Sequence, residues 1–398
     1  MALPLIYNVR SLGQRWKVTL LAVIGIGMVV AVFVTLLAME SGFRISLRST
    51  GSPDNGIVTQ RGSMSELTSW MNIADANVIK VDPRVARDAA GQPLASCEVV
   101  ILSNRPRKSD GQPANVTFRA VTPEAFKVRN QVKIVEGRNL TPGLYEVIAG
   151  KKIADRVNGL SIGSEVPLQR KQWKVVGLFT ADGSSFESEV WGDYDAMAPA
   201  IGRNSGCSSL TLRLADPRTL AAFDKDVRAN PRVQLQVDSE PKYYENLAGG
   251  TSTALLILAG FVGVVMGIGA VFGAMNTMYA IVSQRTREIG TLRALGFSRF
   301  SILLSFMMES VLLSLVAGVL GCLLASTMNG FTAGTGNTQS FSELAFAFRV
   351  TPPIIAIGMI FAVVMGILGG LLPAMRASRM AITMPWLRPS AAIAGAPL

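Results

Sequence analysis

Four long apolar runs limit what this chain can fold into. They cover residues 18–39, 253–282, 301–328 and 353–373. Each run is long enough to cross the hydrocarbon core of a bilayer, which takes about 20 residues of helix. Only 16% of the 398 residues are charged and the mean hydropathy is +0.37, whereas a soluble domain carries about 25% charged residues. The sequence therefore predicts a membrane protein with four transmembrane helices.

The distribution of charge predicts how these helices are oriented. Residues 40–251 hold 27 Lys/Arg and 24 Asp/Glu, a net charge of +3, while the rest of the chain holds 11 and 3, a net charge of +8. The excess basic residues flank the apolar runs, at Arg10, Arg15, Lys17, Arg285, Arg287, Arg293, Arg299, Arg376, Arg379 and Arg388. Because basic residues stay on the cytoplasmic side, both termini are expected there and the 40–251 block outside. The basic excess is thus explained by the membrane, and no nucleic-acid partner is expected.

These patterns divide the chain into nine segments. The boundaries are 1–17 cytoplasmic, 18–39 first span, 40–251 extracytoplasmic (periplasmic) domain, 252–282 second span, 283–300 cytoplasmic coupling segment, 301–328 third span, 329–352 short extracytoplasmic loop, 353–373 fourth span and 374–398 cytoplasmic tail. The first apolar run is longer than the core of a signal peptide and lacks an A-x-A-like cleavage site, so we interpret it as a retained span.

The 40–251 block has the composition of a globular α+β domain. Alternating apolar residues at 115–121 and 208–214 predict half-buried strands. From 214 to 237 a strand, a helix opening at Asp216 and Pro217, and a second strand form a β-α-β unit. Strand and helix signals also alternate in "YEVIAGKKIADRV" and "KQWKVVGLF". The fold class expected is a four-helix transmembrane protein with a large α+β extracytoplasmic domain inserted between the first and second spans.

The residue inventory excludes several kinds of chemistry. The chain has no histidine and three cysteines, which excludes His-based triads and the usual zinc sites, so no metal ligands are assigned. A G-x-x-x-x-G-K-[ST] nucleotide-binding motif is absent, and no catalytic residue or cofactor is assigned to this chain. Cys97 and Cys207 both fall in the exported block; a disulfide between them and two unpaired thiols are equally compatible with the sequence.

The segment "SQRTREIGTLRALG", residues 283–296, lies between the second and third spans. Ile289, Leu292 and Leu295 recur at helical spacing, which predicts a short amphipathic helix that Gly296 ends. On physical grounds alone this segment is either a membrane-surface helix or a docking helix for a cytoplasmic partner. Glu309, about two turns into the third span, is a further site candidate because it would need a partner, and an arginine of this segment is available.

Glycines in the second span predict close helix packing. Two small-xxx-small pairs occur there, Gly263 with Gly267 and Gly269 with Gly273. Whether the packing partner is another protomer or a helix of the same chain stays open.

The 283–296 segment resembles the signature of the MacB/FtsX-type permeases of ABC transporters, "Q/ERTREIGxxRALGAS". The resemblance is nearly continuous from Gln284 to Ser298, with Phe297 where alanine is common. "FMMESVLLSLVAGVLG" resembles the third span of that family, "GGLLPAMRASRM" resembles its closing motif, and "FRAVTPEAFKV", "IVEGRNL" and "SIGSEVPL" resemble pieces of its periplasmic domain. "SSFESEVWGDYDAM" is similar to the DevC-like branch of stand-alone permeases. One departure is "AITMPWLRP", which replaces the usual "DPVEALR"-like ending.

The resemblance implies a machine in which this chain is not itself an enzyme. A separate cytoplasmic ATPase would bind ATP and Mg, and a second permease protomer, identical or different, would complete the membrane part. The ATPase would act on a coupling helix, and the long second span would transmit the motion to the exported domain. Lipids, lipoproteins or amphiphiles are the expected cargo, passed to a periplasmic adaptor. The coupling residues implied are Arg285, Arg287, Glu288, Ile289, Gly290, Leu292, Arg293, Ala294, Leu295 and Gly296.

Two other functions are alternatives to ATP-driven export. The first is an FtsX-like regulator that activates an extracytoplasmic cell-wall hydrolase, but that class has a smaller exported domain. The second is a membrane enzyme. Glu187, Glu189 and Asp193 form an acidic stretch, but with no paired nucleophile and base we interpret it as a solvated surface loop.

Overall fold

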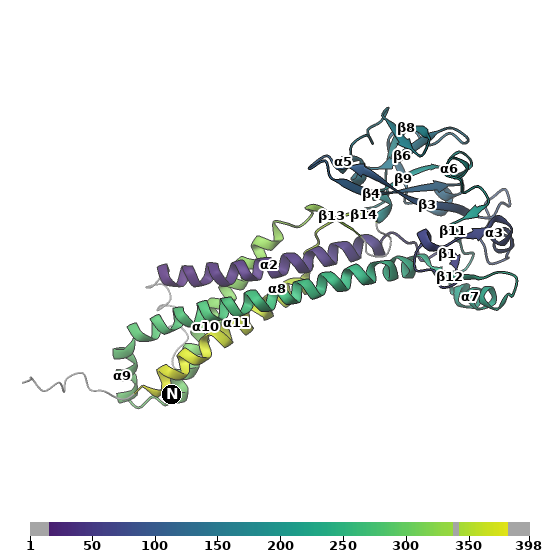
Figure 1. Ribbon diagram of the computed structural model, residues 1–398. Coiled ribbons are helices and arrows are strands. Elements are labelled where there is room, and N and C mark those ends of the chain that lie inside the picture. Colours follow the sequence, from purple (N-terminus) through teal and green to yellow (C-terminus); the bar gives the residue numbers. More distant parts are fainter. Residues whose placement is uncertain (1–15, 337–341, 381–398) are drawn as a thin grey trace, which may run out of the picture. The chain divides into compact units, whose positions relative to one another are not determined.

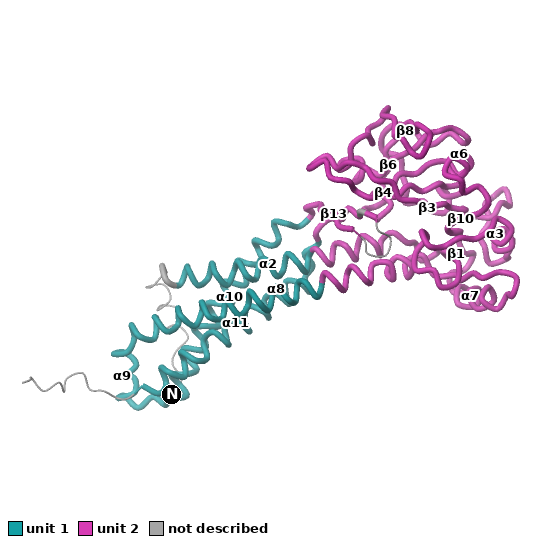
Figure 2. Tube along the Cα trace, viewed as in Figure 1, with its two compact units in different colours: residues 1–38, 256–329, 349–398 teal, residues 39–255, 330–348 magenta. Residues whose placement is uncertain are grey.

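The computed structural model describes residues 16–336 and 342–380, and it divides into two compact units that Figure 2 colours separately. We call them the helical unit, residues 1–38, 256–329 and 349–398, and the sheet unit, residues 39–255 and 330–348. Arg10, Arg15, Arg388 and the segment "AITMPWLRP" lie outside the described residues.

Four helices are long and apolar enough to cross a membrane, as the sequence predicts. They are α2 (Trp16–Arg48), α8 (Glu240–Gln284), α10 (Arg299–Ser326) and α11 (Pro352–Arg379), labelled in Figure 1. α2 continues beyond the expected end at residue 39, and α8 begins twelve residues before the expected start at 252. Polar residues there do not break the helices, and Pro241 lies in the first turn of α8, where its missing N–H costs no hydrogen bond.

Small residues bring α10 and α11 into close contact within the helical unit. A Cβ added at Gly318 would lie 2.9 Å from Cβ of Ala362, and one added at Gly370 would lie 2.6 Å from Cβ of Ser310. The Ser310 hydroxyl donates to the Gly366 carbonyl at 2.6 Å. Glycine at these positions therefore lets the two helices approach closely.

The sheet unit is built on a ten-stranded mixed sheet. Its strands are β1 (Asn55–Gln60), β3 (Ala95–Pro106), β4 (Pro113–Val121), β5 (Lys133–Gly137), β6 (Glu146–Gly150), β7 (Glu165–Leu168), β8 (Lys171–Thr180), β9 (Glu189–Asp193), β11 (Ser209–Arg213) and β12 (Leu235–Ser239). Their order is β12-β1-β11-β3-β4-β9-β6-β8-β5, with β7 paired to β8. The β4–β9 and β6–β8 pairs are parallel and the others antiparallel. β2 (Met71–Asn72) and β10 (Gly206–Cys207) form a separate short pair.

Short helices connect these strands. They are α3 (Ile73–Lys80), α4 (Ala125–Val128), α5 (Lys151–Arg156), α6 (Tyr194–Ala200) and α7 (Leu220–Ala229), with 3₁₀ turns at Glu66–Thr68, Ser185–Ser188 and Pro217–Thr219. The predicted β-α-β unit is present: Asp216 caps the turn that leads into α7, and β11 and β12 both run antiparallel to β1, which lies between them. The α+β character predicted for this domain is thus confirmed.

Aromatic side chains form a second core in the sheet unit. Trp191 and Phe186 are fully buried and pack against each other, and Phe186 also packs against Tyr244 from the first turns of α8. Phe43, from the last turns of α2, belongs to the same cluster. Phe346 belongs to the same cluster. It lies on the hairpin β13 (Thr332–Gly336) and β14 (Glu343–Ala347). The segment between the third and fourth spans, expected as a short extracytoplasmic loop, contains this hairpin, and apolar residues such as Phe346 fill the second core of the sheet unit.

Candidate functional site

The predicted coupling segment begins at a corner formed by Arg285. α8 ends one residue before it and α9 (Thr286–Ala294) begins one residue after it. The buried Arg285 side chain donates from Nη1 to Oε2 of Glu309 on α10 at 2.9 Å, and from Nε to Oε2 of Glu288 on α9 at 2.9 Å. Its guanidinium lies 5.3 Å from the ring centre of Phe306. An ion pair and a cation–π contact thus fix the corner to α10.

Glu309 lies where a charged group is costly without a partner. Its side chain is 3% exposed, on a helix long and apolar enough to cross a membrane. The sequence suggested an arginine of the coupling segment as its partner, and the structure places Arg285 there. Truncating either member would leave the other charge buried.

α9 presents one buried face and one exposed face. Ile289 is buried and Leu292 half-buried, whereas Arg287, Thr291 and Ala294 are exposed. Leu295, expected on the same apolar face as Ile289 and Leu292, is 72% exposed. The physical reason is that each three-residue step falls 60° short of a full turn, so two steps carry Leu295 about 120° away from Ile289. The exposed face of α9 therefore carries one basic residue, Arg287, and the 52%-exposed side chain of Glu288, which is paired with Arg285. Leu295 adds an apolar edge.

A Schellman motif ends α9. Gly296 has φ of +91°, its N–H donates to the Arg293 carbonyl at 3.2 Å, and the Phe297 N–H donates to the Leu292 carbonyl at 3.2 Å. Glycine suits this left-handed conformation, which agrees with the predicted helix stop. Ser298 then caps α10 by accepting from the Ser301 N–H at 3.1 Å. The chain thus reverses direction within a few residues.

The four glycines singled out in α8 behave in two ways. A Cβ at Gly263 would lie 2.8 Å from the Phe33 ring, and one at Gly267 would lie 3.2 Å from the Phe361 ring, so both pack against side chains of the same chain. Gly269 and Gly273 have no other atom within 4 Å of such a Cβ and line a groove of about 480 Å³ between α2 and α8. The second pair therefore has no close packing partner among the described residues.

At its other end, α8 begins inside a buried polar network of the sheet unit. Glu240, its first residue, accepts from Arg129 Nε at 2.9 Å and from Asn55 Nδ2 at 2.9 Å. Arg129 also binds Glu98 through Nη1 and donates to the Thr211 hydroxyl at 2.9 Å. Neither the Arg129 nor the Glu240 side chain is exposed. Buried charges thus join the start of a candidate membrane helix to the centre of the sheet.

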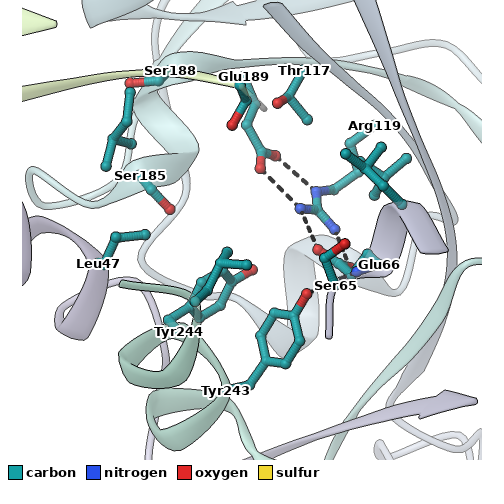
Figure 3. Close-up of a pocket in the computed structure, with 15 residues that line it drawn as sticks. Leu47, Ser65, Glu66, Thr117, Arg119, Ser185, Ser188, Glu189, Tyr243 and Tyr244 are labelled. Carbon is teal, nitrogen blue, oxygen red and sulfur yellow. Dashed lines mark hydrogen bonds and ion pairs between the residues drawn. The ribbon is translucent and has the colours of Figure 1, made fainter. Parts of the chain in front are cut away.

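Arg119 continues this network toward a small cavity. It donates to Glu66 at 2.7 and 3.0 Å, to Glu189 at 2.7 and 2.8 Å, and to Glu98 at 2.8 Å. Figure 3 shows its guanidinium between Glu66 and Glu189, beside a cavity of about 50 Å³. The Tyr244 hydroxyl lines this cavity and has no hydrogen-bond partner among the described residues. A polar cavity of this size has room for ordered water.

The network shifts its carboxyl groups in opposite directions. Burial alone would raise the pKa of Glu66, but the charge and hydrogen bonds of Arg119, with the Ser209 hydroxyl, hold this pKa below its ordinary value. Burial raises the pKa of Glu98, and the nearby Arg129 and Arg119 only partly offset it. The carboxylates of Glu66, Glu98, Glu189 and Glu240 outnumber the two guanidinium groups. A neutral Glu98 would reduce that imbalance.

The interpretation of the acidic stretch as a solvated loop is wrong. Glu189 is paired with Arg119 and also accepts from Trp191 Nε1 at 2.8 Å. Glu187 accepts from the backbone N–H groups of residues 181 and 183 and pairs with Lys152, and Asp193 caps α6. All three acidic side chains are buried. Burial with partners makes them structural, and the described residues contain no acidic or cysteine cluster able to hold a metal.

The sequence did not predict the buried network around Arg119 and Arg129, because its members are far apart in the chain. Arg129 and Glu240 are separated by 111 residues, and no spacing pattern links them. A partial signal was present in "ESEVWGD": read as a strand, it places Glu189 and Trp191 on one face, so a buried tryptophan would have predicted a buried glutamate.

Cys97 on β3 and Cys207 on β10 form a disulfide. The bond joins residues 110 apart in sequence, and both cysteines are buried in the core of the sheet unit. This settles the pairing that the sequence left open. Cys322 is the free cysteine, buried in α10.

Four helices long and apolar enough to cross a membrane, with an α+β domain inserted between the first and second, define a multi-pass membrane protein with a large inserted domain. Residues 19–230 match the family described as a MacB-like periplasmic core domain, and residues 260–382 match the FtsX-like permease C-terminal family. The chain belongs to the MacB-like, FtsX-like family of ABC transporter permeases.

Two curated relatives are similar over much of the chain. The macrolide export ATP-binding/permease protein MacB of Hahella chejuensis is 26% identical over 388 residues, which cover 91% of this chain and 56% of that protein. The uncharacterized ABC transporter permease YknZ of Bacillus subtilis is 26% identical over 270 residues, covering 63% of this chain and 65% of that protein. The chain thus spans little more than half the length of the curated relatives it matches.

One solved structure similar to this chain is the periplasmic region of MacB from Actinobacillus actinomycetemcomitans. It has a TM-score of 0.37 and 12% sequence identity, covering 49% of this chain and 92% of that one.

Proposed function

We propose that this chain is the permease subunit of an ATP-driven exporter that works by mechanotransmission. A separate cytoplasmic ATPase, which binds ATP and Mg, would dock on the exposed face of α9. The single observation that carries the proposal is the Arg285 corner. Because Arg285 is buried and bound to both Glu309 and Glu288, a force on α9 would be transmitted to α10 and α8 instead of bending a flexible loop.

The other end of α8 supports the same mechanism. α8 is 45 residues long without interruption, which corresponds to about 68 Å of helix. It begins in the Arg129–Glu240 ion pair, so a displacement of the helix would move the charged centre of the sheet with it. A buried, directional contact of this kind suits the transmission of force better than a solvated linker.

The disulfide and the charge distribution support the proposed placement. Disulfides persist in oxidising compartments, which favours an extracytoplasmic sheet unit containing Cys97 and Cys207. With basic residues around Arg287 and Arg376 on the cytoplasmic side, both termini would lie in the cytoplasm of a bacterial inner-membrane protein. A second permease protomer would complete the membrane part. The proposed cargo is a lipid, lipoprotein or amphiphile, passed to a periplasmic adaptor.

Co-purification with the ATPase tests the proposal. The full chain is solubilised in detergent and purified beside Arg287→Glu, which reverses charge on the exposed face of α9, and Gly290→Trp, which adds bulk where no atom lies within 4 Å. ATPase activity is assayed and bound proteins are identified by mass spectrometry. The control is Arg349→Glu, the same charge reversal at an exposed residue just before α11.

We expect the wild type and Arg349→Glu to retain an ATPase and both α9 variants to lose it. If the α9 variants retain the ATPase, or the wild type binds none, α9 is only a membrane-surface helix and the proposal fails. Recovery of a cell-wall hydrolase in place of an adaptor would replace export with the regulatory alternative.

A further inference from the structure

A second pocket of the helical unit has a composition suited to an anionic ligand. It lies between α8 and the last turns of α11 and has a volume of about 450 Å³. Its lining includes Asn276, Tyr279, Ser283, Thr286, Arg376 and Met380. No acidic side chain is among the described residues that line it.

Arg376 supplies the charge of this pocket. Its guanidinium lies 5.6 Å from the ring centre of Tyr279, and the side chain is exposed. In the described part of the helical unit the acidic residues are Glu288 and Glu309, and both bind Arg285. The charge of Arg376 is therefore not neutralised by a side chain of the described residues, while Tyr279 holds its guanidinium from one side.

The polar groups around Arg376 differ in what they offer a ligand. The hydroxyls of Ser283 and Thr286 donate to backbone carbonyls one turn earlier, at 2.8 and 2.7 Å, so their protons are already used. Tyr279 and Asn276 line the same pocket, and among residues 16–336 and 342–380 no hydrogen bond uses the Tyr279 hydroxyl or the Asn276 amide as a donor. Together with the guanidinium they form a donor set matched to phosphate oxygens.

The position of the pocket selects a lipid over a free anion. α11 has 28 residues, or about 42 Å of helix, against a hydrocarbon core of about 30 Å, and Arg376 lies three residues from its end. That depth corresponds to the headgroup region. At Asn276 the pocket meets the apolar groove between α2 and α8, which is lined by Gly269 and Gly273. A molecule with an anionic head and apolar tails would fit both surfaces, whereas a free phosphate would occupy only the pocket.

We propose that this pocket binds the phosphodiester headgroup of an anionic phospholipid of the surrounding bilayer, with the phosphate against Arg376. The lipid is a resident component of the membrane unit and not the transported cargo. Basic pockets between membrane helices recognise anionic headgroups in this way. The inference stands whether or not α9 binds an ATPase.

Native mass spectrometry of the delipidated full chain in detergent tests this site. Phosphatidylglycerol and phosphatidylcholine are titrated separately against the wild type, Arg376→Gln and Tyr279→Leu. Arg299→Gln is the matched control, because Arg299 is an exposed arginine of the same unit outside the pocket. Unfolding temperatures confirm that each variant is folded. Inorganic phosphate and glycerol 3-phosphate are added as competitors that lack tails.

We expect one phosphatidylglycerol to bind the wild type about tenfold more tightly than phosphatidylcholine, a difference of about 1.4 kcal/mol. Arg376→Gln should lose this preference, Tyr279→Leu should weaken it, and Arg299→Gln should keep it. The proposal is overturned if Arg376→Gln keeps the preference, or if Arg299→Gln loses as much of it, which would indicate general surface charge. Displacement of the lipid by inorganic phosphate would also overturn it.

Discussion

Arg129 and Glu240 form an ion pair in which neither side chain is exposed, with Nε of the arginine 2.9 Å from Oε1 of the glutamate. Glu240 is the first residue of α8, and Arg129 also binds Glu98 and Thr211 in the sheet. The contact is therefore a structural link between the start of a membrane helix and the sheet. Burying such a pair costs desolvation energy, which the additional hydrogen bonds to both members help to offset.

Removing the arginine of this link should destabilise the sheet unit strongly. Arg129→Met leaves Glu98 and Glu240 buried without their common partner, and the expected loss is about 3–5 kcal/mol in the free energy of unfolding. Denaturant unfolding of the purified chain, followed by tryptophan fluorescence, measures it, because Trp173 and Trp191 are fully buried in this unit.

An exposed ion pair provides the control for this loss. Arg228 contacts Asp224 at 2.7 Å, but their side chains are 41% and 26% exposed, so Arg228→Met should cost less than about 1 kcal/mol. Equal losses in the free energy of unfolding for Arg129→Met and Arg228→Met would show that the buried ion pair contributes no more stability than the exposed one.

Acid should destabilise the sheet unit in part through Glu66. Its pKa in the folded protein is held below the ordinary value of 4.5, so the carboxylate contributes stability above about that pH. This contribution is lost as the pH falls through the lowered pKa. In Glu66→Gln the unfolding temperature should therefore fall less steeply on acidification than in the wild type. Parallel profiles for the two proteins would exclude Glu66 as a source of the acid sensitivity.

The stability linked to Glu98 should depend on pH in the opposite direction from that linked to Glu66. Burial raises its pKa, so the stability linked to its protonated form is present at low pH and is lost as the pH rises through the raised value. Glu98→Gln mimics the protonated form, and it leaves Arg129 with Glu240 and Arg119 with Glu66 and Glu189. At neutral pH this variant should cost less than Glu66→Gln in unfolding temperature. A larger cost would mean that the ionised Glu98 is needed between the two arginines.

The sequence predicted those features that depend on local periodicity. The four apolar runs, the β-α-β unit around Asp216 and the stop at Gly296 all follow from neighbouring residues, and the structure agrees with each. Leu295 lies off the face of Ile289 because each three-residue step falls 60° short of a full turn, so two steps rotate the side-chain position by about 120°. The family resemblance is what suggested a coupling role for residues 283–296, which physical reasoning alone left open against a membrane-surface helix.

Features that depend on long-range contacts were not predictable. The network around Arg119 joins residues from β3, β4, β9 and the turn at Glu66–Thr68, and no pattern in the sequence relates them. Glu189 was interpreted as solvated because charged residues are rarely buried, and only the fold supplies its arginine. For a similar reason, the hairpin containing Phe346 was not predicted to join the sheet unit, since partners such as Phe43 lie far away in the chain.

The disulfide should contribute substantially to the stability of the sheet unit. Cys97 and Cys207 are 110 residues apart, and closing a loop of that length restricts the unfolded chain by about 4–5 kcal/mol in the entropic account. The double variant Cys97→Ala with Cys207→Ala should lose about 2–5 kcal/mol. Reductant should lower the unfolding temperature of the wild type and leave that of the double variant unchanged. Insensitivity of the wild type to reductant would contradict a structural role for this bond.

Two glycines of the helical unit should differ in their tolerance of a larger side chain. A Cβ at Gly370 would lie 2.6 Å from Ser310 on α10, whereas one at Gly273 has no atom within 4 Å. Gly370→Val should therefore separate α10 from α11 and destabilise the unit by about 1–3 kcal/mol or more, as overpacking does. Gly273→Val should leave the stability of the chain itself almost unchanged.

Measuring both the unfolding temperature and the oligomeric state of the detergent-purified variants separates two uses of glycine. If Gly273→Val changes neither the unfolding temperature nor the oligomeric state, the groove at Gly273 does not receive a helix of a second protomer. If that variant unfolds normally but dissociates, a second copy packs against Gly273, and the small-residue pair in α8 serves association instead of the internal bundle. A loss of unfolding temperature as large as that of Gly370→Val would contradict the open groove that the structure places at Gly273.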